Sequence, residues 1–337
     1  MRLSTKISLQ RGTACCKMVC MKRLALALLA AALLLTLAGC GANGTIAANE
    51  KSDTVVNIVT TLFPAYDFAR VIGGERCTVT LLVPPGAESH SYEPTPQDVL
   101  RIENCDLLFA NGGESEEWLE TLLSGAEGDF SALYMLDCVQ ALEEEEKEGM
   151  QDLHEEAEEG KIEYDEHVWT SPRNAMEICR ALCRTLCSLD PDGAALYRTN
   201  CEDYCAQLEE LDAAFRRIVA SGRLDCVIFA DRFPVRYFVE EYGLDYYAAF
   251  PGCADDTEPS ARTVAFLIDR VREQAVPAVF YIEYSNQKMA DVICEDTGCK
   301  KLLFHSCHTL SAEDLENGAS YLGLMWANCE RIREALG

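Results

Sequence analysis

One stretch of the chain reads Pro84-Pro85-Gly86-Ala87-Glu88-Ser89-His90-Ser91-Tyr92-Glu93-Pro94-Thr95-Pro96-Gln97-Asp98. The preceding run, Cys77 to Val83, alternates β-branched and apolar residues as a strand does, and Pro84-Pro85-Gly86 prevents its continuation. Thr95-Pro96 fits an N-cap followed by proline at the first helical position. We therefore predict that His90 lies on a loop past the carboxyl end of a strand, where ligands collect in open α/β sheets.

A second segment has the same arrangement. It reads Tyr164-Asp165-Glu166-His167-Val168-Trp169-Thr170-Ser171-Pro172, with a histidine shortly before a Ser-Pro helix start. Taken alone, either loop histidine is explained by hydrogen bonds to backbone or water, and this alternative stays open. Two histidines held alike, with an acidic segment between them, favour metal ligation, because neutral imidazole is the commonest protein ligand for zinc.

The length and net charge of the chain limit the classes of protein to which it can belong. The 337 residues are enough for two compact domains. The first 39 residues hold six basic residues and no acidic ones, which leaves 23 Lys and Arg against 56 Asp and Glu in the remainder, a formal charge of −33. Such a surface repels nucleic acid and raises the local concentration of cations, so we expect no nucleic-acid partner.

The N-terminal segment has the features of an export signal. Lys22-Arg23 precedes an apolar run, Leu24 to Leu37, of about 14 residues, which suits a signal peptide and is too short to span a bilayer. It ends in Leu37-Ala38-Gly39-Cys40, which resembles the lipobox of bacterial lipoproteins, where the cysteine is lipidated and becomes the mature N-terminus. An ordinary secretory signal with a chance cysteine is the alternative. We expect a signal peptide at 1–39, a lipidated Cys40 with a flexible tether at 40–53, and an extracytoplasmic protein anchored to the bacterial cell membrane.

The 18 cysteines do not show a disulfide framework by their spacing, although export permits disulfides. Two predicted helices carry cysteines at every fourth residue, along one face. These are Cys179, Cys183 and Cys187 in the first and Cys201 and Cys205 in the second. We interpret them as small apolar packing residues, with pairing across helices as the alternative. The absence of any CxxC motif disfavours a thiolate zinc knuckle.

From Asp53 onwards, predicted strands and helices alternate, which implies parallel sheets covered on both faces. In the first part we predict strands at 55–61, 77–83, 107–110 and 132–136 and helices at 65–72, 97–102, 115–123 and 172–188. Past Gly222 we predict strands at 226–230, 246–250, 278–282 and 301–304 and helices at 234–242, 260–274, 287–295 and 315–336. The second part therefore repeats the architecture of the first, without a sequence repeat.

Residues 194–220 contain no proline or glycine and have an apolar residue or cysteine every three or four positions. A helix of this length runs on the order of 40 Å and crosses a whole domain. We predict an α/β fold of two lobes, each a parallel sheet flanked by helices. The N-terminal lobe spans 54–190 and the C-terminal lobe 223–337, and one long rigid helix within 191–222 joins them.

The first lobe also holds an acidic segment, 143–166, which includes Glu143-Glu144-Glu145-Glu146 and His154. This composition cannot form a core and predicts a solvated insertion. Because the segment ends immediately before His167, a weak cation collector at the mouth of a metal site is its candidate function.

Three predicted strand ends of the second lobe carry polar residues that can complete a metal site: Asp231, Glu283 and the group His305-Ser306-Cys307-His308. A four-coordinate zinc takes nitrogen, sulfur or carboxylate donors, so two from each lobe suffice. We expect His305 or His308 to bind metal, with His305 nearer the strand end and Cys307 the least favoured donor.

Each of the two carboxylates can also have a role without direct contact to a metal. Asp231 can pair with Arg232 or cap the helix that follows Pro234. Glu283 can be a surface carboxylate or an acceptor that orients an imidazole ligand.

Taken together, these motifs resemble the zinc and manganese solute-binding lipoproteins of bacterial ABC importers. The resemblance runs from about Val55 to the C-terminus, and its segments are Thr61-Leu62-Phe63-Pro64-Ala65-Tyr66-Asp67-Phe68-Ala69, Leu82-Val83-Pro84-Pro85-Gly86, His90 to Pro96, Asn111-Gly112 with Glu117-Trp118, and Asp165 to Pro172. The resemblance implies that His90 and His167 are the two metal ligands of the first lobe. It also implies that the acidic insertion is the charged loop of zinc-type members and that the metal lies in the cleft between the lobes.

The second lobe departs from the family pattern. Members usually place histidine or glutamate where this chain has Ala230-Asp231-Arg232, and aspartate where it has His305 to His308. Tyr242-Gly243-Leu244 and Glu258-Pro259-Ser260 still match, so we interpret the chain as a subfamily with substituted ligands. Glu258 is either an alternative ligand or a carboxylate at a helix start.

The implied function is capture of Zn²⁺, with Mn²⁺ as the alternative, and delivery to a membrane permease driven by an ATPase. We expect a monomer and no enzyme. Zinc is preferred because imidazoles with few carboxylates suit it better than manganese. One rival is a zinc hydrolase with Glu283 as general base, which the absence of HExxH disfavours. The other is a surface adhesin or metal-storage lipoprotein.

Overall fold

The structure, a computed structural model, describes residues 55–89, 91–151, 163–252 and 259–337. Contacts divide the chain into two units, Met1–Ser52 and Asp53–Gly337, and the fold described below is that of the second. The predicted signal peptide with Cys40, as well as His90, His154 and Glu258, therefore lie outside the described residues. Within the described ranges, every helix is too short or too polar to cross a membrane.

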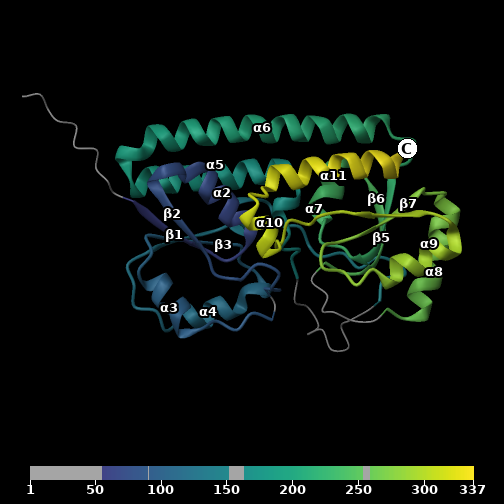
Figure 1. Cartoon of the computed structure of the whole chain (residues 1–337), viewed down its shortest axis with the longest axis horizontal. Helices are drawn as coiled ribbons and strands as arrows, with labels where there is room; N and C mark the ends of the chain where they lie inside the picture. Colours follow the sequence, from purple (N-terminus) through teal and green to yellow (C-terminus); the bar gives the residue numbers. More distant parts are fainter. Residues whose placement is uncertain (1–54, 90, 152–162, 253–258) are drawn as a thin grey trace, which may run out of the picture. The chain divides into compact units, whose positions relative to one another are not determined.

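The N-terminal lobe contains a parallel sheet of four strands in the order β2-β1-β3-β4 (Figure 1). The strands are β1 (Val56–Thr60), β2 (Cys77–Leu81), β3 (Leu107–Ala110) and β4 (Ser131–Tyr134). Helices α3 (Pro96–Glu103) and α4 (Glu117–Leu123) pack on one face, and α2 (Phe63–Gly73) and α5 (Pro172–Leu189) pack on the other. Strand β3 is buried throughout, as expected of a parallel strand covered on both faces.

The C-terminal lobe repeats this arrangement with the strand order β6-β5-β7-β8, which confirms the predicted similarity of the lobes. Its strands are β5 (Cys226–Arg232), β6 (Asp245–Phe250), β7 (Ala278–Tyr281) and β8 (Lys300–Leu303). Helices α8 (Ala261–Gln274) and α9 (Lys288–Thr297) cover one face, and α7 (Arg236–Tyr242) and α11 (Tyr321–Leu336) cover the other. In each sheet the strand order reverses between the two central strands, β1 and β3 in the first lobe and β5 and β7 in the second. Ligands of open α/β sheets bind at the carboxyl ends of the strands at such a point.

The long helix α6 (Ala194–Ser221) has 28 residues and ends one residue beyond the predicted stretch, 194–220. It packs against α2 and α5 of the first lobe and α11 of the second, and Figure 1 shows it running alongside α5 and α11. Its buried face includes Tyr204, Leu208 and Phe215, and one continuous hydrophobic cluster extends from it into both lobes.

The cysteines of α5 and α6 are packing residues, as predicted. Four of them, Cys179, Cys183, Cys201 and Cys205, are buried with free thiols. Cys187 is also free and is half-buried. Along these helices cysteine therefore acts as a small apolar residue.

The prediction of one continuous helix over residues 315–336 is wrong. The segment forms two helices, α10 (Ala312–Glu316) and α11. Gly318 has a φ of 78°, a conformation that ends α10, and the Ser320 side chain accepts a hydrogen bond from Gly323 N at 3.1 Å to begin α11. The apolar spacing continues across this break, which explains the wrong prediction.

The acidic segment is less detached than its composition predicts. Gln151 N donates to Ala249 O of β6 at 2.9 Å, and Glu144 accepts a hydrogen bond from Gly252 N at 3.0 Å. Glu143 also forms an antiparallel bridge with Tyr164. The backbone of residues 143–151 is therefore attached to the second lobe, while Glu143, Glu145, Glu146 and Glu148 are exposed, as a solvated segment requires.

A series of buried hydrogen bonds ties the two lobes together. Asp67 Oδ2 of α2 accepts from Tyr321 N at the start of α11 at 2.9 Å. The Tyr321 hydroxyl donates to Trp169 O at 2.6 Å, and Trp169 Nε1 donates to Ser306 O at 2.8 Å. All four residues are buried. The loop after β8 is therefore fixed relative to the first lobe.

We expect Tyr321→Phe to lower the free energy of unfolding by about 1–3 kcal/mol, because it leaves a buried carbonyl without its donor. Urea denaturation measures the change. Tyr284→Phe is the control, since Tyr284 is 52% exposed and its substitution should cost less than about 0.5 kcal/mol. Equal losses in the two variants would contradict the assigned role of Tyr321.

Candidate functional site

A small pocket lies at the carboxyl ends of β5 and β7, and residues of both lobes line it. His167 and Glu88 come from the first lobe, and Glu283, Ser306 and His308 from the second. Its free volume is about 20 Å³, room for one particle the size of a water molecule. The pocket therefore suits a single ion rather than an organic ligand.

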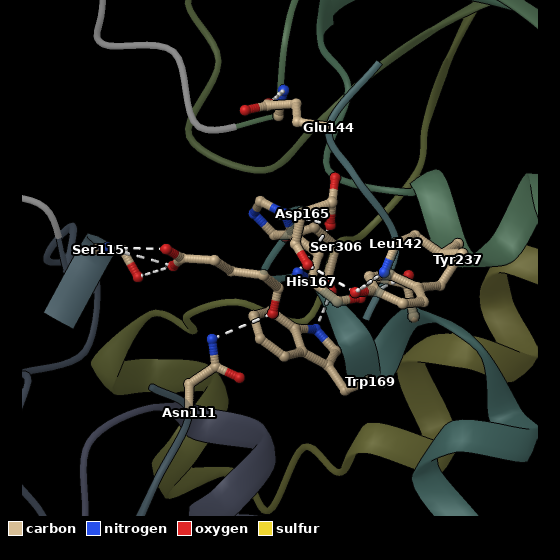
Figure 2. Close-up of polar contacts among 12 residues, drawn as sticks. Asn111, Ser115, Leu142, Glu144, Asp165, His167, Trp169, Tyr237 and Ser306 are labelled. Carbon is tan, nitrogen blue, oxygen red and sulfur yellow. Dashed lines mark hydrogen bonds and ion pairs between the residues drawn. The ribbon is translucent and has the colours of Figure 1, made fainter. Parts of the chain in front are cut away.

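His167 is 3% exposed and is held by Asp165 (Figure 2). Asp165 Oδ1 accepts the backbone N–H of His167 at 2.8 Å and lies 3.2 Å from its ring Nδ1. This contact orients the ring and places Nε2 on the side away from the carboxylate, as in metal-binding histidines supported by a carboxylate. Burial lowers the pKa of His167, but the charges of Asp165, Glu166 and Glu144 outweigh it and raise the pKa above 6.5.

The segment around His167 is fixed from both lobes (Figure 2). From the first lobe, Asn111 Nδ2 donates to Glu166 O at 3.1 Å, and Ser115 N donates to the Glu166 carboxylate at 2.9 Å. From the second lobe, the Tyr237 hydroxyl donates to Asp165 O at 2.7 Å. The two residues that precede His167 are therefore held by groups of both lobes.

His308 lies beside His167, with 5.9 Å between their ring centroids. Its Nε2 is 3.0 Å from the hydroxyl of Ser89, the residue that precedes His90 in the chain. The structure thus brings His167 and His308 together, next to the chain neighbour of His90.

The other predicted ligands of the second lobe, His305 and Asp231, make hydrogen bonds within that lobe. His305 Nδ1 accepts a hydrogen bond from Cys307 N at 3.0 Å, and its backbone is bonded on both sides by Asn328. Asp231 accepts from the backbone N–H groups of Arg232, at 2.9 Å, and Ile282, at 3.3 Å. Neither His305 nor Asp231 lines the pocket.

Of the two remaining candidate ligands, Glu283 lines the pocket and Cys307 does not. The Glu283 carboxylate accepts hydrogen bonds from Ser306 N, at 2.7 Å, and from the Ser306 hydroxyl. Cys307 is fully buried, and burial raises the pKa of its thiol well above the ordinary value, which disfavours a thiolate ligand. Among the residues that the structure describes, no three His, Cys, Asp or Glu side chains form a group able to hold a metal ion.

Asp165, Asn111 and Tyr237 hold the His167 segment in position, and none of them is among the predicted site residues. The Asp-x-His spacing of Asp165 and His167 is the signal that indicates an orienting carboxylate. The contacts of Asn111 and Tyr237 with the His167 segment have no local signal, because they span 55 and 72 residues.

A family model described as ZnuA, zinc-uptake complex component A periplasmic, matches residues 58–335. The chain belongs to this family. The resemblance found in the sequence motifs is thereby confirmed.

The relatives of this ZnuA family member include zinc and manganese proteins. The chain is 28% identical over 314 residues to the high-affinity zinc uptake system protein ZnuA of Bacillus subtilis, and the match covers 91% of this chain and 95% of that protein. It is 29% identical over 279 residues to the manganese-binding lipoprotein MntA of Halalkalibacterium halodurans, with 82% and 87% covered. The match to the zinc-binding lipoprotein AdcA of Streptococcus pneumoniae, 28% over 290 residues, covers 85% of this chain but 56% of AdcA, so the chain spans about half of that relative.

Solved structures share the fold. The metal-dependent lipoprotein YcdH of Bacillus subtilis superposes with a TM-score of 0.69 at 27% identity, covering 84% of this chain and all of that one. The Zn(II)-bound ZnuA-like domain of Streptococcus pneumoniae AdcA also has a TM-score of 0.69, at 24% identity, over 84% of this chain and 99% of the domain. The second likeness supports the fold alone.

We expect Asp165→Asn to lower the pKa of His167 in the metal-free protein, because the variant removes the negative charge that stabilises the imidazolium ion. A titration of the histidine ring signals by NMR measures this pKa. The control is Glu148→Gln, which removes an exposed carboxylate of the acidic segment. A His167 pKa that is the same in the wild type and in Asp165→Asn would refute the role of Asp165.

Proposed function

We propose that the protein captures a divalent metal ion outside the cytoplasm, Zn²⁺ in preference to Mn²⁺, and delivers it to a membrane permease driven by an ATPase. The observation that carries the proposal is the meeting of two histidines, the buried His167 and the half-buried His308, in an ion-sized pocket between the lobes. Membership of a zinc-uptake family supports it. The family and the relatives described above are named for metal uptake and binding, not for catalysis, which favours a receptor over a hydrolase.

The proposed ligands are His90, His167 and His308, with Glu283 as the fourth. Three imidazoles and one carboxylate form a donor set that suits tetrahedral zinc, whereas manganese prefers more oxygen donors. Glu283 is the carboxylate that already lines the pocket. His305 is assigned instead to the loop, since its Nδ1 accepts the Cys307 N–H.

The charge of the chain supports cation capture. The part after residue 39 has a formal charge of −33, and the acidic segment is attached beside the pocket through the contact of Glu144 with Gly252. Gly252 itself lines the pocket. A negative surface raises the local concentration of cations and their rate of association. In this proposal the acidic segment collects cations.

The N-terminal segment supports a location at the cell membrane. Cys40 is the proposed lipid anchor, which holds a monomeric receptor at the outer face of the cell membrane, close to its permease. The signal-like segment 1–39 and the lipobox support it.

The 84–89 loop is the proposed route for the metal. Its contacts with the second lobe include the hydrogen bond from Gly86 N to Thr309 Oγ1 at 2.9 Å, the pair of Glu88 with Arg232 at 3.3 Å, and the approach of the Ser89 hydroxyl to His308 Nε2 at 3.0 Å. By contrast, separating the lobes would break the continuous core around α6. Movement of this loop is therefore the less costly way to admit and release an ion.

We expect His167→Ala and His308→Ala each to weaken zinc binding more than about 100-fold, because changes in residues that merely support a ligand already cost about 10–100-fold. Isothermal titration of residues 41–337 with a competing chelator measures the affinity. His305→Ala is the matched control from the same loop and should bind zinc within about tenfold of the wild type. Loss in His305→Ala with none in His308→Ala would overturn the ligand assignment.

We expect Thr309→Val to release zinc about fivefold faster, because it removes a hydrogen bond of about 1 kcal/mol that holds the 84–89 loop closed. Stopped-flow mixing of the zinc-loaded protein with a chelator measures the dissociation rate. Thr199→Val is the control, since Thr199 is exposed on α6. Equal rates in the wild type and Thr309→Val would exclude this loop contact as a barrier to release.

A further inference from the structure

Two cysteines of the second lobe, Cys294 and Cys299, lie in contact with each other and do not line the pocket. Cys294 is in the last turns of α9, and Cys299 is the residue before β8. Their sulfur atoms are 3.5 Å apart, and both residues are half-buried. This position differs from that of the buried packing cysteines of α5 and α6.

The contact follows from the end of α9. Gly298 has a φ of 77°, a left-handed conformation that reverses the chain, and its N–H donates to Cys294 O at 2.9 Å. Cys299 N donates to the Thr297 hydroxyl at 3.3 Å. These backbone hydrogen bonds thus hold Cys299 against the preceding turn.

A second close pair provides a contrast. The sulfurs of Cys201 and Cys205 are 4.0 Å apart, but these residues lie on the same face of one continuous helix and are 5% and 6% exposed. Parallel side chains on one helix face do not point toward each other as a disulfide requires. An oxidant also has little access to them.

We propose that Cys294 and Cys299 form a disulfide when the protein meets a disulfide oxidant of the extracytoplasmic space. One cysteine thiolate attacks the oxidant disulfide, which gives a mixed disulfide and releases one oxidant thiolate. The second cysteine thiolate then attacks the mixed disulfide and releases the other. The two cysteines lose two protons and two electrons, and the oxidant becomes two thiols.

The bond would close a loop of six residues between the end of α9 and β8, which is an edge strand of the sheet. It would restrict the unfolded chain and so stabilise this side of the lobe. Burial and the neighbouring Cys299 raise the pKa of Cys294 to about 12, so this thiol is a slow nucleophile at neutral pH. The exchange therefore needs long equilibration.

Peptide mass spectrometry of the full-length chain tests the proposal. The protein is equilibrated overnight with oxidised and reduced glutathione, denatured, treated with N-ethylmaleimide and digested with trypsin. Cleavage after Lys288 and Lys300 releases Met289–Lys300, which contains Cys294 and Cys299 and no other cysteine. The expected peptide has no label and two hydrogens fewer than the reduced form.

The same digest contains an internal control. Peptide Thr199–Arg216 holds Cys201 and Cys205 and should carry two labels. Two labels on Met289–Lys300, or a disulfide from it to another peptide, would overturn the proposal. As a second measurement, oxidation should raise the melting temperature of the wild type but not of Cys299→Ser, and an equal rise in both would also overturn it. Neither result depends on zinc binding, so the proposed function is tested separately.

Discussion

The buried contact between Asp67 and the first N–H of α11 is the constraint on which the arrangement of the lobes depends. The first N–H groups of a helix have no partner within it, and one that is buried must find an acceptor elsewhere. Here the acceptor belongs to the other lobe, and the bonds continue through Tyr321 and Trp169 to Ser306. Breaking any of them leaves a polar group in a medium of low dielectric constant. The loop that carries His308 is therefore positioned by the core.

This constraint explains why the pocket forms between lobes that have separate sheets. Each sheet presents the carboxyl ends of its strands, but a sheet alone supplies only part of a donor set. His167 is oriented by Asp165, and its segment is bonded by Asn111 of the first lobe and Tyr237 of the second. Groups of the protein itself thus hold the imidazole segment in place, which reduces the cost of ordering ligands on binding.

The sequence predicted most of the fold because its local signals agree with the packing. Strand 107–110 has the predicted bounds, and α5 and α6 end within one residue of prediction, since caps and apolar spacing act within a few residues. The attachment of residues 143–151 was missed because its partner, Ala249, lies about a hundred residues away. Of the candidate site, the His167 segment was recognisable from its motif, whereas the loop contacts of Asp231 and His305 depend on tertiary neighbours.

The two histidines after β8 have different surroundings, which their distance from the strand end does not predict. The sequence offers His305 or His308 as a ligand, with His305 nearer the strand end. Cys307, however, has a φ of 64°, a conformation that side-chain-bearing residues rarely adopt. The chain turns there, so that His308 faces Ser89 and His167. Such conformations persist where the surroundings enforce them, and they gather at functional sites. Tyr284, which lines the pocket, has a φ of 61°, so two loops at this pocket contain a residue with a positive φ. We infer that the turn at Cys307 directs His308 toward the first lobe.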